Sequence, residues 1–262
     1  MPEKSSYAPG TPSWSDVASP DLDNVVGFYE GLFGWTASEG SEETNGYRMF
    51  TQGDKAVAGA GPGQSPEQPP AWTTYITVED ADATAEKIKA AGGSVLMEPM
   101  DVMTAGRMAI FMDPAGAAFA VWQPKDHIGS QIVNEPVSMA WNELRTRDMD
   151  GAAAFYGEVF GWEPQAFAEM DGYNVWMLGG SAPENGIGGV IDMSANDFPA
   201  EVPPHWDVVF AVEDADATAA NAGELGGTVT VPPMDIPVGR MAGIQDPTGA
   251  MFTVIKLAPR PS

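Results

Sequence analysis

The sequence predicts an α+β protein made of four βαβββ modules, which form two tandem domains with cupped mixed sheets. The first observation is the segment Val-Glu-Asp-Ala-Asp-Ala-Thr, which occurs at residues 78–84 and again at 212–218. The second is that residues 28–35 resemble residues 155–162. The third is a weaker repeat inside each half, because both helices of a half open with an Asp-x-Asp segment after a strand. An identity of this length is too long for chance, so the chain is a duplication.

The duplication sets the domain boundaries that we expect. The first domain covers residues 1–125, the second covers 136–262, and residues 126–135 connect them. We expect each half to form an independent cup of paired βαβββ modules, and the two cups to superpose.

The first module begins with a short strand at residues 14–18. Asp21 or Asp23 then caps a helix whose apolar residues recur at helical spacing, and Gly34 ends it. Residues 47–59 read as a hairpin. The stretch 61–70, rich in Pro, Gly and Gln, is typical of a linker between modules.

The second module contains the repeated segment. Its Asp residues favour a helix N-terminus, and the Gly pair 92–93 supplies a left-handed exit. A hairpin around residues 113–116, Asp-Pro-Ala-Gly, fits a type I turn and closes the half. The second half repeats this order, with the following expected elements: a strand at 141–144, a helix at 150–160, a hairpin at 173–191 and a linker at 192–204.

Composition excludes several classes of protein. The chain has no cysteine, so disulfides, zinc–thiolate sites and thiol nucleophiles are excluded. Its formal net charge of -25 repels nucleic acid and anionic membranes, and no apolar run approaches the roughly 20 residues that span a bilayer. The N-terminus lacks the apolar core of a signal peptide. We therefore expect a cytoplasmic monomer or homodimer whose partner is a small molecule.

The Asp-x-Asp helix opening, the Phe-Tyr-x-x-x-Phe-Gly helix and the Asp-Pro-x-Gly hairpin resemble the vicinal-oxygen-chelate superfamily. That superfamily includes glyoxalases, extradiol dioxygenases and bleomycin-resistance proteins. More narrowly, residues 141–144, 127–129 and 203–206 resemble the two-domain glyoxalase-like proteins of actinobacteria that are named as hydroxylases. A mycobacterial culture-filtrate antigen belongs to that group.

The resemblance also implies where metal ligands, usually His, His and Glu, would stand. The matching positions here hold Trp14, Thr73 and Ala120 in the first half, and Trp141, Asp207 and Thr253 in the second. Indole and methyl side chains offer a metal no lone pair, and threonine is a poor ligand. We therefore expect no metal cofactor. The alternative is a shifted divalent-metal site made of Glu143, His205 and Asp207.

The same three residues are the candidate catalytic groups. Strand alternation places Trp141 beside Glu143 on one face, and desolvation by indole rings would raise the pKa of the carboxyl toward that of a general base. The residues that we expect to bind the ligand are Trp14, Asp16, Tyr47, Trp72, Arg107, Trp141, Tyr173, Trp206 and Arg240.

Each candidate has a structural alternative. The tryptophans could instead belong to the core, the tyrosines could be structural, and Asp16 or Glu143 could bind arginine or backbone. Arg107 and Arg240 could pair with Asp101 and Asp235 rather than hold a ligand. For His127 in the connector, a structural contact is the favoured interpretation.

Two functions fit these observations. One is a glyoxalase-like enzyme, of lyase, isomerase or hydroxylase class, acting on an apolar, aromatic or carbonyl metabolite without the usual metal. The other is a non-catalytic protein that sequesters an antibiotic or similar compound. Because imidazole and carboxylates gather only in the second half, we expect any chemistry in the second cup.

Overall fold

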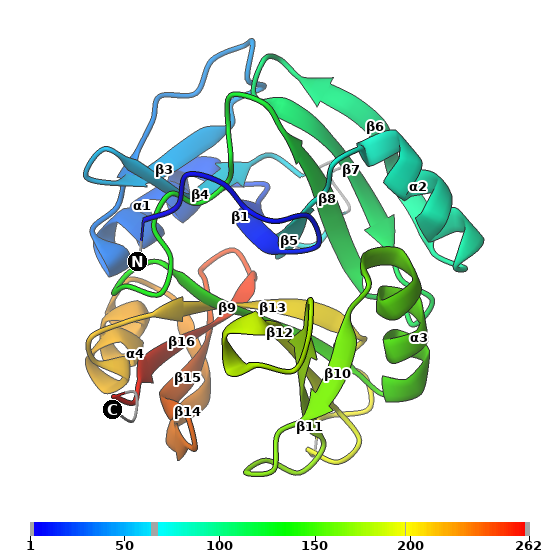
Figure 1. Ribbon diagram of the computed structural model, residues 1–262. Helices are drawn as coiled ribbons and strands as arrows, with labels where there is room; N and C mark the ends of the chain where they lie inside the picture. The colour runs from blue at the N-terminus through cyan, green and yellow to red at the C-terminus, as the bar shows by residue number, and fades with distance from the viewer. Residues whose placement is uncertain (1–2, 64–67, 197, 260–262) are drawn as a thin grey trace.

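Two eight-stranded mixed sheets, with two helices in each half, make up the computed structural model, which describes residues 3–63, 68–196 and 198–259. The first sheet has the strand order β2-β3-β4-β1-β5-β8-β7-β6, and the second has the equivalent order β10-β11-β12-β9-β13-β16-β15-β14. The upper and lower parts of Figure 1 correspond to the two halves. This architecture confirms the predicted fold.

The first half contains the following elements: β1 (Pro12–Ala18), α1 (Leu22–Phe33), β2 (Thr36–Ala37), β3 (Arg48–Gln52), β4 (Lys55–Gly61), β5 (Ala71–Thr77), α2 (Ala81–Ala90), β6 (Ser94–Val102), β7 (Gly106–Met112) and β8 (Ala118–Pro124). The second half contains β9 (Met139–Thr146), α3 (Met149–Phe160), β10 (Glu163–Ala166), β11 (Tyr173–Met177), a 3-10 turn (Pro183–Asn185), β12 (Gly186–Asp192), β13 (His205–Ala211), α4 (Ala215–Glu224), β14 (Thr228–Ile236), β15 (Gly239–Gln245) and β16 (Met251–Leu257). Of the two expected linkers, residues 64–67 and residue 197 lie outside the described residues.

The central strands of each sheet join its two modules. Strand β1 pairs antiparallel with β5, which sets Asp16 opposite Thr73, and β9 pairs antiparallel with β13, which sets Glu143 opposite Asp207. Within a module, the first strand runs parallel to the last, as β9 does with β12. The candidate residues of each half therefore meet at the middle of its sheet.

The repeated segment caps helices as predicted. Asp80 accepts a hydrogen bond from the backbone N–H of Ala83 at 2.9 Å, and Asp214 accepts one from Ala217 at 3.0 Å. Each helix is followed by a glycine with φ of 91°, in the left-handed region that disfavours other residues. The cap of the first helix is Asp21, which resolves the alternative between Asp21 and Asp23.

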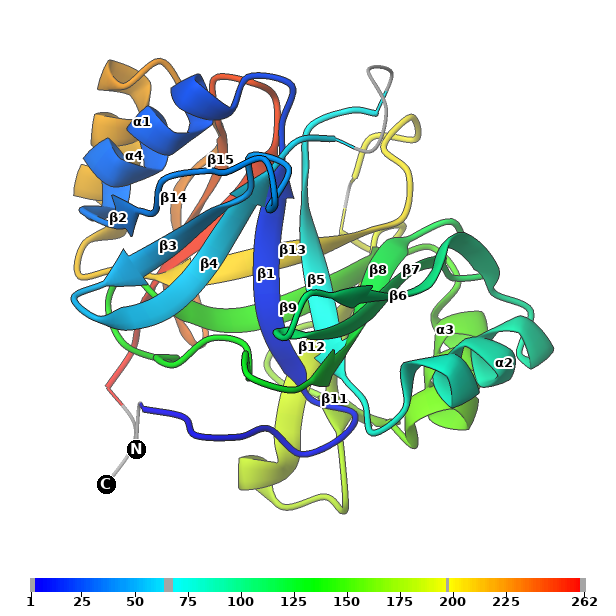
Figure 2. The same cartoon turned by 90° about the horizontal axis from the view of Figure 1, so that it is seen from above.

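The expectation of two independent cups is wrong, because the halves share both large hydrophobic cores. One core packs α1 and strands of the first module against α4 and strands of the last module. The other packs α2 and its strands against α3 and strands of the third module. In Figure 2 the helices accordingly lie as two pairs, α1 with α4 and α2 with α3, on opposite sides of the molecule.

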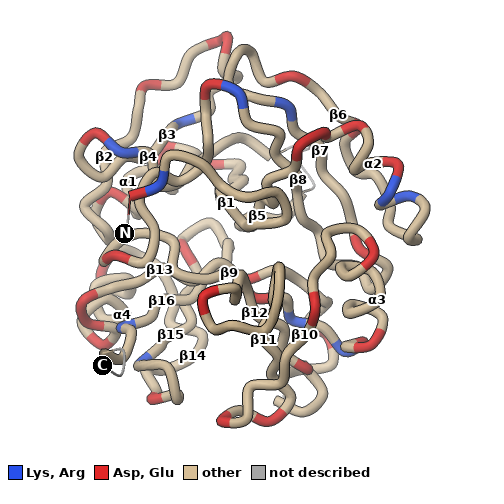
Figure 3. The backbone as a smooth tube through the Cα atoms, in the orientation of Figure 1, with Lys and Arg blue, Asp and Glu red and all other residues tan. Residues whose placement is uncertain are grey.

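Acidic residues occur in both halves of the chain. Asp and Glu are scattered over both halves of the tube in Figure 3, and Lys and Arg are sparse. Among the residues that the structure describes, no helix is both long and apolar enough to span a membrane.

Candidate functional site

The second cup, meaning the face of the second sheet turned away from the helices, carries a row of polar side chains. Leu144 points into the core beneath α3, so strand alternation puts Trp141, Glu143 and Arg145 together on the opposite face. Asp207 lies across from Glu143 on the neighbouring strand. The two central strands thus bring a tryptophan, two carboxylates and an arginine together.

A chain of polar contacts leads from Trp141 to Glu143. The indole Nε1 of Trp141 donates to the hydroxyl of Tyr173 at 3.0 Å, and that hydroxyl is near enough to Glu143 to act on its pKa, which it lowers. The Tyr173 ring lies so close to Gly189 on β12 that a Cβ there would collide with its hydroxyl. Glycine at this position therefore makes room for the chain.

Arg145 is the centre of the second cup and is not among the residues predicted from the sequence. Its Nε donates to Glu143 at 3.3 Å, and its Nη2 donates to Asp207 at 2.8 Å. The same Nη2 also donates to the hydroxyl of Thr253 at 3.2 Å. The exposed fractions of the Arg145, Glu143 and Asp207 side chains are 12%, 15% and 2%. The available signal was alternation, because Arg145 follows Glu143 by two residues on one strand.

Burial and charge set the ionisation of this cluster. Desolvation raises the pKa of Glu143, and the negative charge of Asp207 adds to this, while the guanidinium of Arg145 partly offsets both. Burial alone would lower the pKa of Arg145, but the two carboxylates outweigh it and raise that pKa. The arginine is therefore a fixed cation, and Glu143 is the group that holds a proton more tightly than usual.

His205 lies beside this cluster, at the register position opposite Arg145. Its Nδ1 is 2.8 Å from the carbonyl oxygen of Pro203, which assigns the ring proton to Nδ1 when the ring is neutral. Desolvation lowers the pKa of His205, and the nearby Arg145 lowers it further. The neutral imidazole is therefore the favoured form.

The three residues of the alternative metal site do not form one. Across residues 3–63, 68–196 and 198–259, no group of three His, Cys, Asp or Glu side chains has the spacing of a metal site. The guanidinium of Arg145 occupies the place between Glu143 and Asp207 that a cation would need. The residues present therefore do not fit the divalent metal that the superfamily implies, in either half.

The first cup has an equivalent series of contacts from a tryptophan through a tyrosine to a carboxylate. Trp14 Nε1 donates to Tyr47 at 3.1 Å, and the Tyr47 hydroxyl donates to Asp16 at 3.1 Å. The hydroxyl of Tyr75 donates to the same Asp16 oxygen at 2.9 Å. Desolvation raises the pKa of Asp16 to about 6, although both tyrosine hydrogen bonds act to lower it. Among the residues that the structure describes, no arginine pairs with Asp16, and Ala18 stands where the second half has Arg145.

The first cup is also packed with its own side chains. Trp14, Tyr75 and Trp122 are buried in one apolar cluster, and Trp14 is only 4% exposed. His127 of the connector covers this cluster, with its ring edge-on to Trp14 at 4.5 Å between centroids. Its carbonyl oxygen accepts from Trp122 Nε1 at 2.8 Å. In the second cup the equivalent Trp141 is only half-buried, so that cup is the more accessible of the two.

Trp72 and Trp206 lie in the shared cores, which corrects their assignment as ligand-binding residues. Trp72 Nε1 donates to Tyr29 at 2.8 Å, and Trp206 Nε1 donates to Tyr156 at 2.9 Å. Both indoles are nearly fully buried among helix-facing side chains. The reason is alternation, since each lies one residue away from a cup-facing position on its strand.

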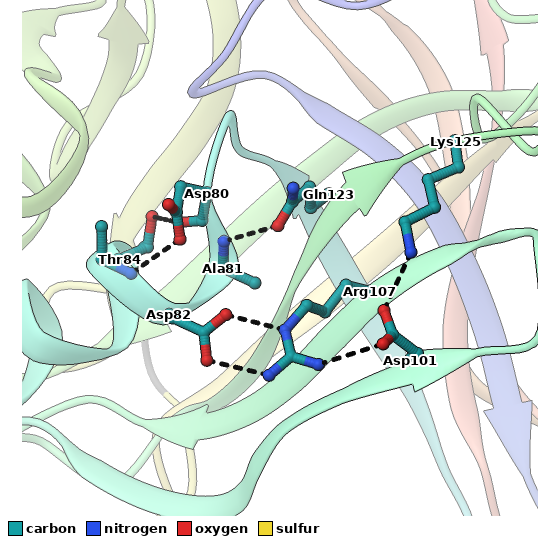
Figure 4. Close-up of polar contacts among 9 residues, drawn as sticks. Asp80, Ala81, Asp82, Thr84, Asp101, Arg107, Gln123 and Lys125 are labelled. Carbon is teal, nitrogen blue, oxygen red and sulfur yellow. Dashed lines mark hydrogen bonds and ion pairs between the residues drawn. The ribbon is translucent and has the colours of Figure 1, made fainter.

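Arg107 and Arg240 are also on the helix side, and their alternative role as ion-pair partners is the one observed. The guanidinium of Arg107 donates two hydrogen bonds of 2.8 Å to Asp82 and lies 3.6 Å from Asp101 (Figure 4). Arg240 holds Asp216 in the same way and donates to Asp235 at 3.0 Å. The second Asp of the repeated segment therefore anchors the helix N-terminus to the neighbouring strand.

Comparison with known proteins places this chain in a family. The Glyoxalase/Bleomycin resistance protein/Dioxygenase superfamily matches residues 13–121 and 131–254, which cover one half each. The chain therefore belongs to this superfamily, as the sequence motifs indicated, and it carries two tandem copies of the domain.

Two relatives match along nearly the whole chain. The protein named "Putative glyoxylase CFP32" from Mycobacterium tuberculosis is 42% identical over 99% of this chain and 100% of its own length. The "Anthracycline biosynthesis protein DnrV" of Streptomyces peucetius is 41% identical over 96% of this chain and 94% of its own length.

Solved structures share the fold at low sequence identity. The 2,3-dioxygenase LapB from Pseudomonas sp. KL28 aligns with a TM-score of 0.66 at 14% identity, covering 98% of this chain and 96% of that one. The Mn(II)-bound glyoxalase from Novosphingobium aromaticivorans aligns with a TM-score of 0.64 at 16% identity, covering 96% of this chain and 85% of that one.

Proposed function

We propose that the protein binds a small apolar or aromatic compound with a carbonyl group in the second cup, and performs acid–base chemistry on it without a metal. The observation that carries this proposal is the chain from Trp141 through Tyr173 to Glu143 on a half-buried face. The equivalent face of the first half is filled by buried side chains and covered by His127. That asymmetry supports the second cup as the site.

The chemistry of the side chains favours a flat ligand. An indole face offers a large apolar surface, and the neighbouring hydroxyl and carboxyl offer orientation. The name of the relative DnrV refers to anthracycline biosynthesis, which makes a compound of that class one candidate for the ligand. A flat aromatic ring system would stack on the indole of Trp141.

Glu143 is the proposed acid–base group. A carboxyl whose pKa is raised by desolvation accepts a proton more readily near neutral pH than an exposed one does. The proposed step is removal of a proton from a carbon or hydroxyl next to the ligand carbonyl and its return to another atom of the same ligand. This balance needs no oxidant, and the neutral His205 lies near enough in the sheet register to act as a second proton carrier.

A second candidate is ligand binding without turnover. Arg145 already engages both Glu143 and Asp207, which restrains the carboxylate that the reaction would use. The family's name also includes bleomycin resistance. Absence of any chemical change in a compound that binds the second cup would favour this candidate.

The experiment uses two matched variants that each remove one hydroxyl. Tyr173→Phe alters the second cup and Tyr47→Phe makes the same change in the first. The protein is incubated with a small-molecule extract, and retained compounds are identified by native mass spectrometry. We expect Tyr173→Phe to retain less of the compound than the parent does, and Tyr47→Phe to retain as much. Loss of the compound in Tyr47→Phe alone would place the site in the first cup and contradict the proposal.

A further inference from the structure

Arg145 has more donors than the protein uses. Its Nε and Nη2 donate to Glu143, Asp207 and Thr253, which accounts for three of the roughly five N–H groups of a guanidinium. Within the described part of the chain, Nη1 makes no hydrogen bond, and the Arg145 side chain as a whole is 12% exposed. Nη1 is therefore the donor that remains for a ligand.

We propose that Arg145 donates to the carbonyl oxygen of a neutral ligand in the second cup, and so takes the role of the cation at this site. The inference rests on the proposed function and adds the residue that holds the ligand oxygen and the charge state of that ligand. Arg145 lies on the same face as Trp141, four residues along one strand. A planar ligand on the indole can therefore extend its oxygen toward the guanidinium.

The charge balance favours a neutral ligand over an anion. The positive charge of Arg145 is balanced by Asp207 at 2.8 Å. The cluster of Arg145, Asp207 and Glu143 is therefore neutral when Glu143 is protonated and negative when Glu143 is ionised. The chain as a whole has a formal charge of -25. A carboxylate ligand would enter a site without net positive charge, whereas a carbonyl needs only the N–H dipole.

The guanidinium is held in place before a ligand arrives. Thr253 and Asp207 both accept from Nη2, and the Phe198 ring lies 5.5 Å from the guanidinium carbon. Arg147 stabilises the segment that follows Phe198, because its guanidinium donates to the carbonyl oxygens of Val202 and Pro199 at 2.7 Å each. A fixed donor loses little freedom on binding, which strengthens its contribution to affinity.

The first half shows which uncharged residues the fold accepts at the positions of Arg145 and Asp207. Ala18 and Thr73 stand at the positions of Arg145 and Asp207. The double variant Arg145→Ala/Asp207→Thr therefore removes the cation and its buried partner together, which avoids leaving an unpaired buried charge. Arg145→Lys is a second variant, which keeps the charge but not the planar fork.

The probes are 9-fluorenone, fluorene and fluorene-9-carboxylate, with binding followed by quenching of tryptophan fluorescence. Fluorenone differs from fluorene by its carbonyl oxygen. We expect the parent protein to bind fluorenone about tenfold more tightly than fluorene and more tightly than the carboxylate, because the hydrogen-bond donor is charged. In the double variant the preference for fluorenone over fluorene should disappear, so that the two neutral probes bind with equal affinity. In Arg145→Lys the preference for fluorenone over fluorene should be smaller than in the parent and larger than in the double variant.

Two results would overturn the inference while leaving the proposed function in place. One is an unchanged preference for fluorenone in the double variant, and the other is tighter binding of the carboxylate by the parent. If Trp141→Ala weakens both neutral probes in these cases, the second cup still binds flat compounds. Failure of the parent to bind fluorenone at all would overturn the inference as well, and equal binding by Trp141→Ala and parent would contradict the proposed function itself.

Discussion

The hydroxyl of Tyr156 lies 3.0 Å from Oδ2 of Asp113, which joins helix α3 of the second half to the β7–β8 turn of the first. The other half returns the same contact, because Tyr29 on α1 donates to Asp246 at 3.1 Å. The other carboxylate oxygen of Asp113 accepts backbone N–H groups of its own turn. The Phe-Tyr helix motif and the Asp-Pro-x-Gly motif are therefore two ends of one contact between the halves.

This contact predicts a loss of stability when the Tyr156 hydroxyl is removed. Tyr156→Phe leaves the buried Trp206 N–H and one oxygen of Asp113 without a partner, which should lower the free energy of unfolding by about 1–3 kcal/mol. Urea denaturation measures the change. Tyr173→Phe, which removes the hydroxyl of a half-buried tyrosine, is the control and should cost less. Equal losses in both variants would show that the contact between halves contributes little.

Asp16 predicts a pH dependence of stability. Its pKa rises from 3.8 to about 6 on folding, so the folded state binds the proton more tightly than the unfolded state. The resulting stabilisation is complete below about pH 4 and is lost as the pH rises through about 6. Asp16→Asn should remove this loss, which is on the order of 3 kcal/mol, since one pKa unit corresponds to about 1.4 kcal/mol.

Unfolding free energies of the parent and Asp16→Asn, measured by urea denaturation at about pH 4 and about pH 7, test this expectation. The difference between the two proteins should change in favour of the variant as the pH rises. Parallel pH profiles would mean that Asp16 is better solvated than its contacts with Tyr47 and Tyr75 indicate.

The residues at the superfamily's metal-ligand positions also predict how much metal the protein holds. Trp14, Thr73 and Ala120 offer a metal nothing useful in the first half, and Arg145 competes for the carboxylates of the second. Elemental analysis of the purified protein should therefore give less than about 0.1 transition-metal ion per chain, and chelator should leave the melting temperature unchanged. One or more metal ions per chain would contradict this expectation.

The repeat and its motifs were sufficient to predict the fold from the sequence. The helix caps at Asp80 and Asp214 and the cup-facing Trp141, Tyr173 and Glu143 follow from local patterns, because capping and strand alternation depend on neighbours in sequence. The shared cores could not be predicted in this way. They depend on which half each helix packs against, and an apolar helix face fits either partner equally well.

Arg107 and Arg145 show that site residues, too, cannot all be predicted from local sequence patterns. Arg107, a predicted ligand-binding residue, points to the helix side, where Asp82 at 2.8 Å is closer than Asp101 at 3.6 Å. Arg145 has alanine as its counterpart in the first half, so the repeat gives no indication of a functional residue at that position. A residue that only one copy carries has to be found from its own strand neighbours.

The most direct test of the site is the turnover, by purified variants, of the compound identified by native mass spectrometry. Removing a general base usually lowers a rate by about 10²–10⁴-fold. Glu143→Gln and His205→Ala should each lose most of the activity while the melting temperature stays close to that of the parent, and Asp16→Asn should retain it. Full activity in Glu143→Gln together with loss of activity in Asp16→Asn would contradict the account, because the reaction would then belong to the first cup.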